Sequence, residues 1–178
     1  MRGERCTCDR RLRSLERLRS AAEYEGPLER AIHQLKYQGR RALAPSLAAL
    51  LVERYAPFLP SEAWLLAVPL HPHRRRQRGY NQSQLLVDEL ARAWPVGLPD
   101  GRLVRVRDTR SQVGLDRAQR RANVEGAFRW LGPPLGQRPI LLVDDVITTG
   151  ATAEACAAAL RGAGAGVVRA LSLARVSA

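Results

Sequence analysis

Short apolar runs alternate along this chain with amphipathic stretches and polar turns. Three compact runs predict buried strands over residues 64–68, 140–143 and 167–174. Two shorter strands are predicted over 103–106 and 127–130, the second alternating apolar and polar residues as an edge strand does. The runs are too short for membrane spans and are bounded by Gly and Pro, which favours strands of a sheet.

Helical spacing of apolar residues fills most of the intervals between these strands. Two amphipathic helices are predicted over 27–35 and 43–51, a third over 81–94 and a fourth over 153–160. From residue 64 onward, strands and helices follow one another in the order typical of an α/β fold. We therefore expect a parallel sheet with helices on both faces, preceded by a helical segment, and ligands at the carboxyl ends of its strands.

The first 25 residues are polar and basic, with Leu12, Leu15 and Leu18 at near-helical spacing. This pattern predicts a short amphipathic helix or a loosely attached leader, so we divide the chain into a leader, 1–25, and one domain, 26–178. A content of 46% apolar residues suffices for a core. Because no secretory signal or spanning segment is evident, we expect a cytoplasmic protein without membrane insertion.

Two adjacent carboxylates, Asp144 and Asp145, end the strand at 140–143, and a hydroxyl-rich turn with Thr148 and Thr149 follows them. The next helix begins beside this turn, and a helix N-terminus offers unpaired N–H donors and partial positive charge to a phosphate. Carboxylates accept hydrogen bonds from sugar hydroxyls or hold a metal bridged to phosphate. The combination predicts a site for a phosphorylated ribose, whereas the alternative is a buried strand with a chance Asp pair.

The run from Val143 to Thr152 resembles the signature of type I phosphoribosyltransferases, which bind 5-phosphoribosyl-1-pyrophosphate (PRPP). The resemblance implies that Asp144 and Asp145 hold the ribose hydroxyls directly or through Mg²⁺. It implies a cradle for the 5′-phosphate in the turn that follows. The ribose and phosphate site would comprise Asp144, Asp145, Val146, Ile147, Thr148, Thr149, Gly150, Ala151 and Thr152.

A basic loop is predicted over 70–79, directly after the strand at 64–68. It carries four arginines and no acid, so it forms an anion site on the same rim, or simply an exposed basic loop. The resemblance implies that Pro69, Leu70, His71 and Arg74 bind pyrophosphate. We treat His71 and His73 as polar loop residues rather than metal ligands, because no thiolate or carboxylate accompanies them.

The stretch from 107 to 125 is polar and rich in arginine, and lies between two predicted strands. Long polar segments in compact domains are usually lids or binding loops. The resemblance places the mobile catalytic loop of the family here, covering the pyrophosphate leaving group. Arg78, Arg105 and Arg107 are the predicted catalytic residues, since arginine stabilises negative charge that develops on the leaving group.

The order of further short motifs is similar to that of the ComF family of phosphoribosyltransferase-like proteins, from about residue 20 to the end. The motifs are Tyr24-x-Gly26-Pro-Leu28, Leu35-Lys36-Tyr37-x-Gly39, Val68-Pro69-Leu70, Arg78-Gly79-Tyr80-Asn81-Gln82, Gln112, Arg121, Asn123-Val124 and Gly126-Ala127-Phe128. The resemblance implies a role in natural competence and DNA uptake. It also implies possible partners among single-stranded DNA, the competence helicase and DNA-processing proteins.

Charge and cysteines leave alternatives open. The net charge is +12, and almost all of the positive charge comes from arginine. This excess of arginine is consistent with binding of phosphate or nucleic acid, and equally with a compositional bias. Many ComF relatives carry an N-terminal four-cysteine zinc module, of which Cys6 and Cys8 resemble a remnant. Two function classes follow: a Mg²⁺-dependent phosphoribosyltransferase, or a non-enzymatic PRPP-responsive adaptor or single-stranded-DNA-binding protein.

Overall fold

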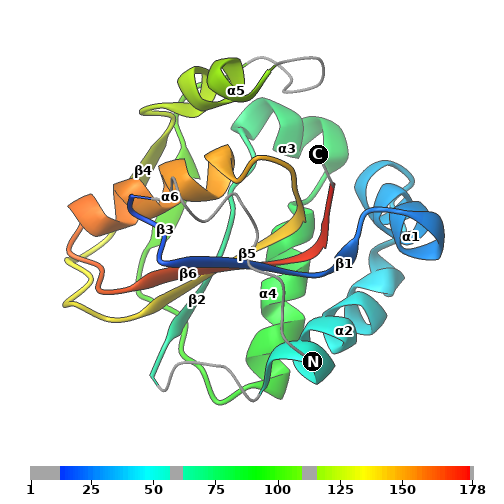
Figure 1. The fold of residues 1–178 in the computed structure, drawn as a ribbon. Coiled ribbons are helices and arrows are strands. Elements are labelled where there is room, and N and C mark those ends of the chain that lie inside the picture. Colours follow the sequence, from blue (N-terminus) through cyan, green and yellow to red (C-terminus); the bar gives the residue numbers. More distant parts are fainter. Residues whose placement is uncertain (1–12, 57–61, 110–115, 177–178) are drawn as a thin grey trace.

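A four-stranded parallel sheet forms the centre of the molecule (Figure 1). The computed structural model describes residues 13–56, 62–109 and 116–176. The strands are β1 (Arg17–Glu23), β2 (Trp64–Ala67), β5 (Ile140–Ile147) and β6 (Val168–Arg175), in the spatial order β1-β6-β5-β2. All neighbouring pairs are parallel, which confirms the predicted sheet.

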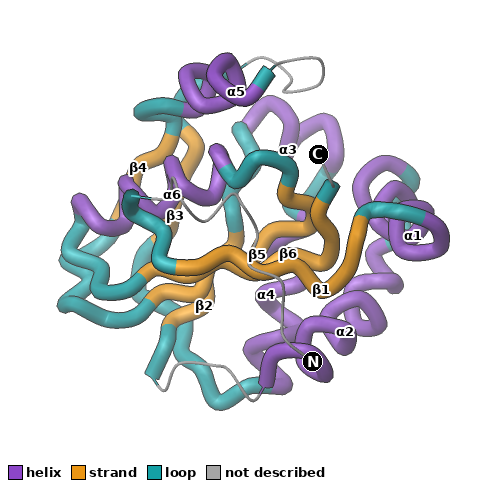
Figure 2. The backbone as a smooth tube through the Cα atoms, viewed as in Figure 1, coloured by secondary structure: helices purple, strands orange, loops and turns teal. Residues whose placement is uncertain are grey.

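Helices cover both faces of this sheet, because its strands are apolar on both sides (Figure 2). On one face lie α1 (Gly26–Tyr37), α2 (Ala44–Tyr55) and α4 (Gln82–Ala93), with the short 3-10 helix η2 (Arg41–Leu43) between the first two. On the other face lies α6 (Ala151–Gly162). Each face of the sheet packs against its helices in a hydrophobic core. Alternate residues of β5 point into the two cores: Leu141 packs on the side of α1, α2 and α4, and Leu142 packs on the side of α6.

A second, smaller unit packs against α6 and against β2 at the edge of the sheet. Strands β3 (Arg102–Arg105) and β4 (Phe128–Leu131) form a separate antiparallel pair. Helix α5 (Arg117–Val124) connects them and packs near α6, so this part of the stretch 107–125 is not the unpacked loop that the sequence predicted. Among the described helices, none combines the length and apolar character needed to cross a membrane.

Several sequence-based expectations about local structure were wrong. Residues 17–23, which we predicted as part of a helical or loose leader, form the edge strand β1, with Leu15 and Leu18 buried and Leu12 outside the described residues. Pairing with β6 overrides the helical spacing of the leucines, because the edge of β6 offers backbone partners to β1.

The basic segment at 70–79 is not a loop throughout. Its residues Pro72–Arg78 form the helix α3, which begins with Pro in the first turn and ends at Gly79 with a φ of +80°. Arginine and glutamine are good helix formers, Pro suits a first turn, and Gly favours the left-handed C-cap. Strand β5 also continues through both aspartates to Ile147 instead of ending before them.

Candidate functional site

The two carboxylates lie near the carboxyl end of β5, next to the end of β2. Val68 N donates a hydrogen bond of 2.9 Å to Val143 O, so the start of the basic segment and the carboxylates share one edge of the sheet. This is the rim at which parallel sheets bind ligands. The structure thus brings together Pro69 and Leu70, both partly buried, with Asp144 and Asp145, as the sequence predicted.

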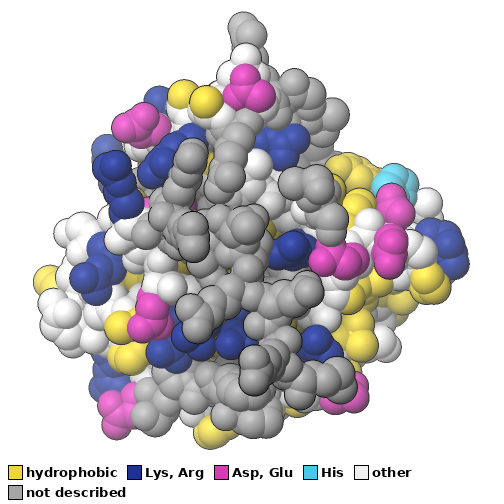
Figure 3. All heavy atoms as spheres, in the orientation of Figure 1, with side chains coloured by type: hydrophobic (Ala, Val, Ile, Leu, Met, Phe, Trp, Pro, Cys, Tyr) yellow, Lys and Arg dark blue, Asp and Glu magenta, His cyan; other side chains and the backbone are white. Residues whose placement is uncertain are grey.

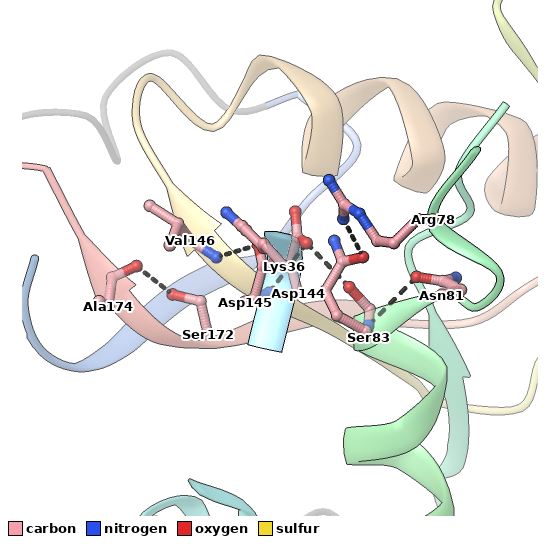
Figure 4. A network of polar contacts seen from close by, with 10 residues as sticks. Lys36, Arg78, Asn81, Ser83, Asp144, Asp145, Val146, Ser172 and Ala174 are labelled. Atoms are coloured by element: carbon pink, nitrogen blue, oxygen red, sulfur yellow. Dashed lines mark hydrogen bonds and ion pairs between the residues drawn. The ribbon is translucent and has the colours of Figure 1, made fainter. Parts of the chain in front are cut away.

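Asp144 is held by the start of α4 (Figure 4). Ser83 Oγ donates to Asp144 Oδ1 over 3.0 Å, and the Asp145 backbone N–H donates to the same oxygen over 2.9 Å. Asn81 Oδ1 in turn accepts from Ser83 N at 3.1 Å and so caps α4. Burial, followed by the charge of Asp145, raises the pKa of Asp144 to about 7, despite these hydrogen bonds and the nearby charge of Lys36.

Asp145 is buried, with 3% of its surface exposed, and pairs with Lys36 on α1. Lys36 Nζ lies 3.0 Å from Asp145 Oδ1, which also accepts a hydrogen bond of 2.6 Å from Val146 N. Asp145 Oδ2 is buried and has no hydrogen-bond partner within the described part of the chain. Burial lowers the pKa of Lys36, but the charges of Asp145 and Asp144 outweigh it and leave that pKa raised, so Lys36 stays charged.

Our sequence reasoning did not assign Lys36 to the site. The signals were present, since it is the chain's sole lysine and lies within the Leu35-Lys36-Tyr37-x-Gly39 motif. The local sequence of α1 does not indicate that this helix end reaches β5 across the sheet face.

The turn after β5 is built to expose backbone donors at the start of α6. Gly150 adopts a φ of +77° at the N-cap of α6 and has no side chain with which to cap the helix, while the Ala151 N–H donates to the Thr149 hydroxyl. Thr149 is partly buried and its Oγ1 lies 3.4 Å from Ala151 N, whereas Thr148 is exposed. Ile147 is buried, so it offers its backbone rather than its side chain to a ligand. Such a helix start suits an anion.

Helix α3 is fastened to the segment that leads into the predicted lid. Nδ1 of His71 lies 3.4 Å from Asp108 Oδ1, and Nδ1 of His73 lies 3.6 Å from Asp108 Oδ2. The expectation that no carboxylate accompanies these histidines was therefore wrong, because Asp108 is distant from them along the chain but close in space. Arg74 Nη2 donates to Thr109 O over 3.2 Å. The two basic segments that the sequence predicted on this rim are therefore in direct contact.

The three predicted catalytic arginines occupy different positions. Arg78, at the end of α3, donates through Nη1 to Gln82 Oε1 and lies near the carboxylates (Figure 4). Arg105, at the end of β3, is buried and donates through Nη2 to Thr109 Oγ1, with its guanidinium 5.5 Å from the Phe128 ring centroid. Burial and then the charge of Arg74 lower the pKa of Arg105.

Arg107 is exposed and donates through Nη2 to Asn123 O over 3.1 Å, so it contacts the end of α5. Arg74 and Arg105 meet at Thr109, the former at its carbonyl and the latter at its hydroxyl. Arg105 Nε is buried without a hydrogen-bond partner among the described residues. Arg74 and Arg105 are neighbouring cations, and Arg105 Nε is a hydrogen-bond donor that the described residues leave unused. A bound anion would offset their mutual repulsion and accept that hydrogen bond.

Positive charge is not confined to this rim. On the face shown in Figure 3, Lys and Arg side chains are distributed among acidic and apolar ones rather than gathered in a single patch. Cys156 is buried, and burial raises its pKa well above the ordinary value. Cys6 and Cys8 lie outside the described residues, and within the described ranges no group of three or more His, Cys, Asp or Glu residues is arranged to hold a metal ion.

Sequence relatives place the chain in a family. It is 36% identical over 165 residues to DNA utilization protein YhgH of Salmonella typhi, with 90% of this chain and 72% of that protein covered. It is 34% identical over 161 residues to Competence protein F of Haemophilus influenzae, covering 85% of this chain and 69% of that protein. The chain belongs to the ComF family.

Other comparisons add little to this ComF assignment. Competence protein ComFC of Streptococcus pneumoniae is 29% identical over 157 residues, covering 88% of this chain and 67% of that protein. No protein-family profile matches the chain. Among solved structures, a hypoxanthine phosphoribosyltransferase from Staphylococcus aureus is similar over 76% of this chain and 62% of that chain, with 12% identity and a TM-score of 0.43. A similarity of that size carries no functional conclusion.

Proposed function

We propose that this ComF-family protein binds PRPP and transfers its phosphoribosyl group to an acceptor nucleophile. The observation that carries the proposal is the meeting, on one rim, of a carboxylate pair, a helix start with glycine at its N-cap and an arginine pair. These three features match the ribose hydroxyls, the 5′-phosphate and the pyrophosphate of PRPP in chemistry. The signature resemblance of residues 143–152 supports the same ligand.

Each part of PRPP is assigned to described residues. Asp144, which is less buried than Asp145, accepts hydrogen bonds from the ribose hydroxyls. Asp145 pairs with Lys36 and so holds the end of α1 against the strand that carries both carboxylates. The turn at Thr148 to Gly150 and the first N–H groups of α6 bind the 5′-phosphate. Arg74 and Arg105 bind the pyrophosphate.

The carboxylate pair fits a Mg²⁺ ion brought in with PRPP. Mg²⁺ prefers oxygen ligands and is commonly held by one or two carboxylates together with substrate phosphates. Asp144 supplies such an oxygen, and Asp145 Oδ2 is a buried acceptor with no partner among the described residues. When bound, the ion would neutralise part of the pyrophosphate charge.

Transfer breaks the bond between ribose C1 and the pyrophosphate oxygen, and the electron pair leaves with pyrophosphate. A new bond forms between C1 and the acceptor, which contributes its electron pair and then loses a proton. Positive charge on the ribose develops near Asp144, and negative charge on the leaving group develops near Arg74 and Arg105. The segment 107–125 would close over the site and exclude water.

Thermal denaturation with PRPP and Mg²⁺ tests binding. A ligand that prefers the native state stabilises it by RT ln(1 + [L]/Kd), about 2.7 kcal/mol at one hundred times Kd. The double variant D144N/D145N also removes the partner of Lys36 and should therefore be less stable without ligand, so its own ligand-free melting temperature is the reference. Relative to that reference it should gain no stabilisation from PRPP, whereas the exposed control variant D88N should keep it. An unchanged shift in the double variant would refute the ribose assignment.

Isotope exchange between labelled pyrophosphate and PRPP, across a panel of bases, tests transfer separately from binding. Exchange that depends on one base supports an enzyme and identifies the acceptor. Stabilisation by PRPP without exchange for any base would instead support a non-enzymatic PRPP-responsive protein, the second function class that the sequence left open.

A further inference from the structure

The aromatic ring of Tyr37 is exposed beside the candidate site. Tyr37 is the last residue of α1 and has 65% of its surface exposed, the largest fraction among the exposed large hydrophobic side chains of the described residues. Each of the other side chains in that group is aliphatic. Lone exposed apolar residues are ordinary on protein surfaces, so exposure alone does not indicate a function.

Two planar side chains contact this ring. The guanidinium carbon of Arg78 lies 5.2 Å from the Tyr37 ring centroid, within the range of a cation–π contact. The ring of His33, one helical turn earlier, lies 4.9 Å away at an interplanar angle of 50°. The tyrosine is thus positioned by contacts on the protein although most of its surface faces solvent.

The same helix end is tied to the carboxylate site. Lys36 precedes Tyr37 and pairs with Asp145 at 3.0 Å. Tyr80 Oη donates to Leu35 O, which fastens the end of α1 to the junction between α3 and α4. Two sequence motifs that are far apart along the chain, Leu35-Lys36-Tyr37-x-Gly39 and Arg78-Gly79-Tyr80-Asn81-Gln82, therefore form one structural unit.

The chain segment around Tyr37 carries positive charge. Arg40 and Arg41 are exposed just after the ring, and no acidic residue occurs between Arg30 and Arg41. The guanidinium of Arg41 lies 4.5 Å from the ring centroid of the buried Tyr80, which keeps it next to Gly79. An exposed aromatic ring among arginines suits a planar base joined to phosphate, since stacking and charge act together.

We propose that Tyr37 and Arg78 form a stacking platform for a nucleobase. The base belongs either to a small acceptor that reacts with PRPP or to single-stranded nucleic acid. The acceptor case rests on the proposed phosphoribosyl transfer, whereas base stacking itself does not. The platform would supply the base-binding surface that the sequence alone did not reveal.

Fluorescence of aminopurine, an adenine analogue quenched by stacking, tests the proposal. The probe is used in two forms: as a mononucleotide or free base with PRPP and Mg²⁺ present, and within a short oligothymidylate without PRPP. Y37A should bind the relevant form about 5- to 150-fold more weakly than the wild type, the range measured for loss of base–aromatic stacking. Y37F keeps the ring and should retain binding. L98A, which removes an exposed side chain elsewhere, should not change it.

The outcomes separate this proposal from the PRPP proposal. Loss of quenching of the mononucleotide or free base in Y37A identifies an acceptor platform, and loss of quenching of the oligomer identifies a single-strand platform. The PRPP-dependent thermal shift of Y37A, measured in parallel, reports on the PRPP site and on folding. Quenching that is equal in Y37A and wild type, or absent from the wild type while PRPP still stabilises it, would overturn the platform and leave PRPP binding intact.

Discussion

Lys36 Nζ lies 3.0 Å from Asp145 Oδ1, and this contact joins the end of α1 to the carboxyl end of β5. The side chains are 17% and 4% exposed, so both charges are largely removed from water. A buried ion pair contributes little net stability, but losing one partner is costly because the other charge remains buried. The pair therefore fixes the position of α1 relative to the site and depends on both members.

Replacement of Lys36 by Met should destabilise the fold by about 3–5 kcal/mol, since Asp145 would be left as a buried charge without compensation. Urea denaturation measures the loss. The double variant K36M/D145N should recover most of it, because both charges are then absent. As a matched control, R92M removes the exposed Arg92–Glu89 pair and should cost less than about 1 kcal/mol. A K36M protein as stable as the wild type would show that the pair is not structural.

Asp144 gives the fold a defined pH dependence. Its pKa is raised from the ordinary value of 3.8 to about 7, so between these values the native state binds more protons than the unfolded state. Stability from this group should therefore fall as pH rises through that window and stay constant above it. The D144N variant lacks the effect, so its free energy of unfolding relative to the wild type should be higher at about pH 8 than at about pH 5. Urea denaturation of both proteins at the two pH values measures the difference. A constant difference between D144N and wild type across the window would contradict the raised pKa.

Arg105 should matter for PRPP more than for folding. Arg105→Met keeps the aliphatic stem near Phe128 but removes the charge that lies beside Arg74. Loss of a charged hydrogen bond costs about 1.5–3 kcal/mol, so PRPP affinity should fall roughly ten- to a hundredfold. Calorimetric titration with PRPP and Mg²⁺ measures the change. Arg102→Met, at the exposed start of the same strand, should bind PRPP as the wild type does. Equal affinities for the two variants would remove Arg105 from the pyrophosphate site.

Single-stranded DNA, if bound, should show a strong dependence on salt, because each phosphate neutralised releases counterions. We predict that DNA and PRPP use separate sites, since a lid that closes over pyrophosphate is poorly suited to a long polymer. Replacing Arg117, Arg120 and Arg121 by Ser should then weaken PRPP transfer and leave DNA affinity unchanged in a filter-binding titration. Displacement of DNA by PRPP at low salt would indicate a shared site. If the protein does not bind DNA, the excess of arginine reflects a compositional bias rather than a DNA-binding function.

The parallel sheet and the rim position of Asp144 could be predicted from the sequence. An apolar run that ends in two acids is a strong local signal, and parallel strands place their carboxyl ends at one edge. The buried Cys156 was also predictable from its alanine-rich helix. These features depend on periodicity and strand order, which a single sequence contains.

The features that were missed depend on contacts between distant segments. Strand β1 contains Arg and Ser residues typical of a surface segment, and its pairing with β6 is visible only in three dimensions. Helix α3 had local signals, Pro72 and Gly79, but the density of arginine favoured a loop interpretation. The partnership of Lys36 with Asp145 depends on where α1 crosses the sheet, which no local pattern encodes.

Within the described residues, strand β1 pairs with β6 alone, from Arg17 opposite Arg169 to Glu23 opposite Arg175, so the sheet joins two parts of the chain that are far apart in sequence. On the ribosome, β1 emerges long before its partner is made. Until then Leu15 and Leu18 have no completed core to enter, since they pack with residues of α6 and β6. The last of the described strands thus closes the sheet, and until it is made the growing chain carries an unpaired strand and exposed leucines, the kind of surface that makes partly folded chains prone to aggregation.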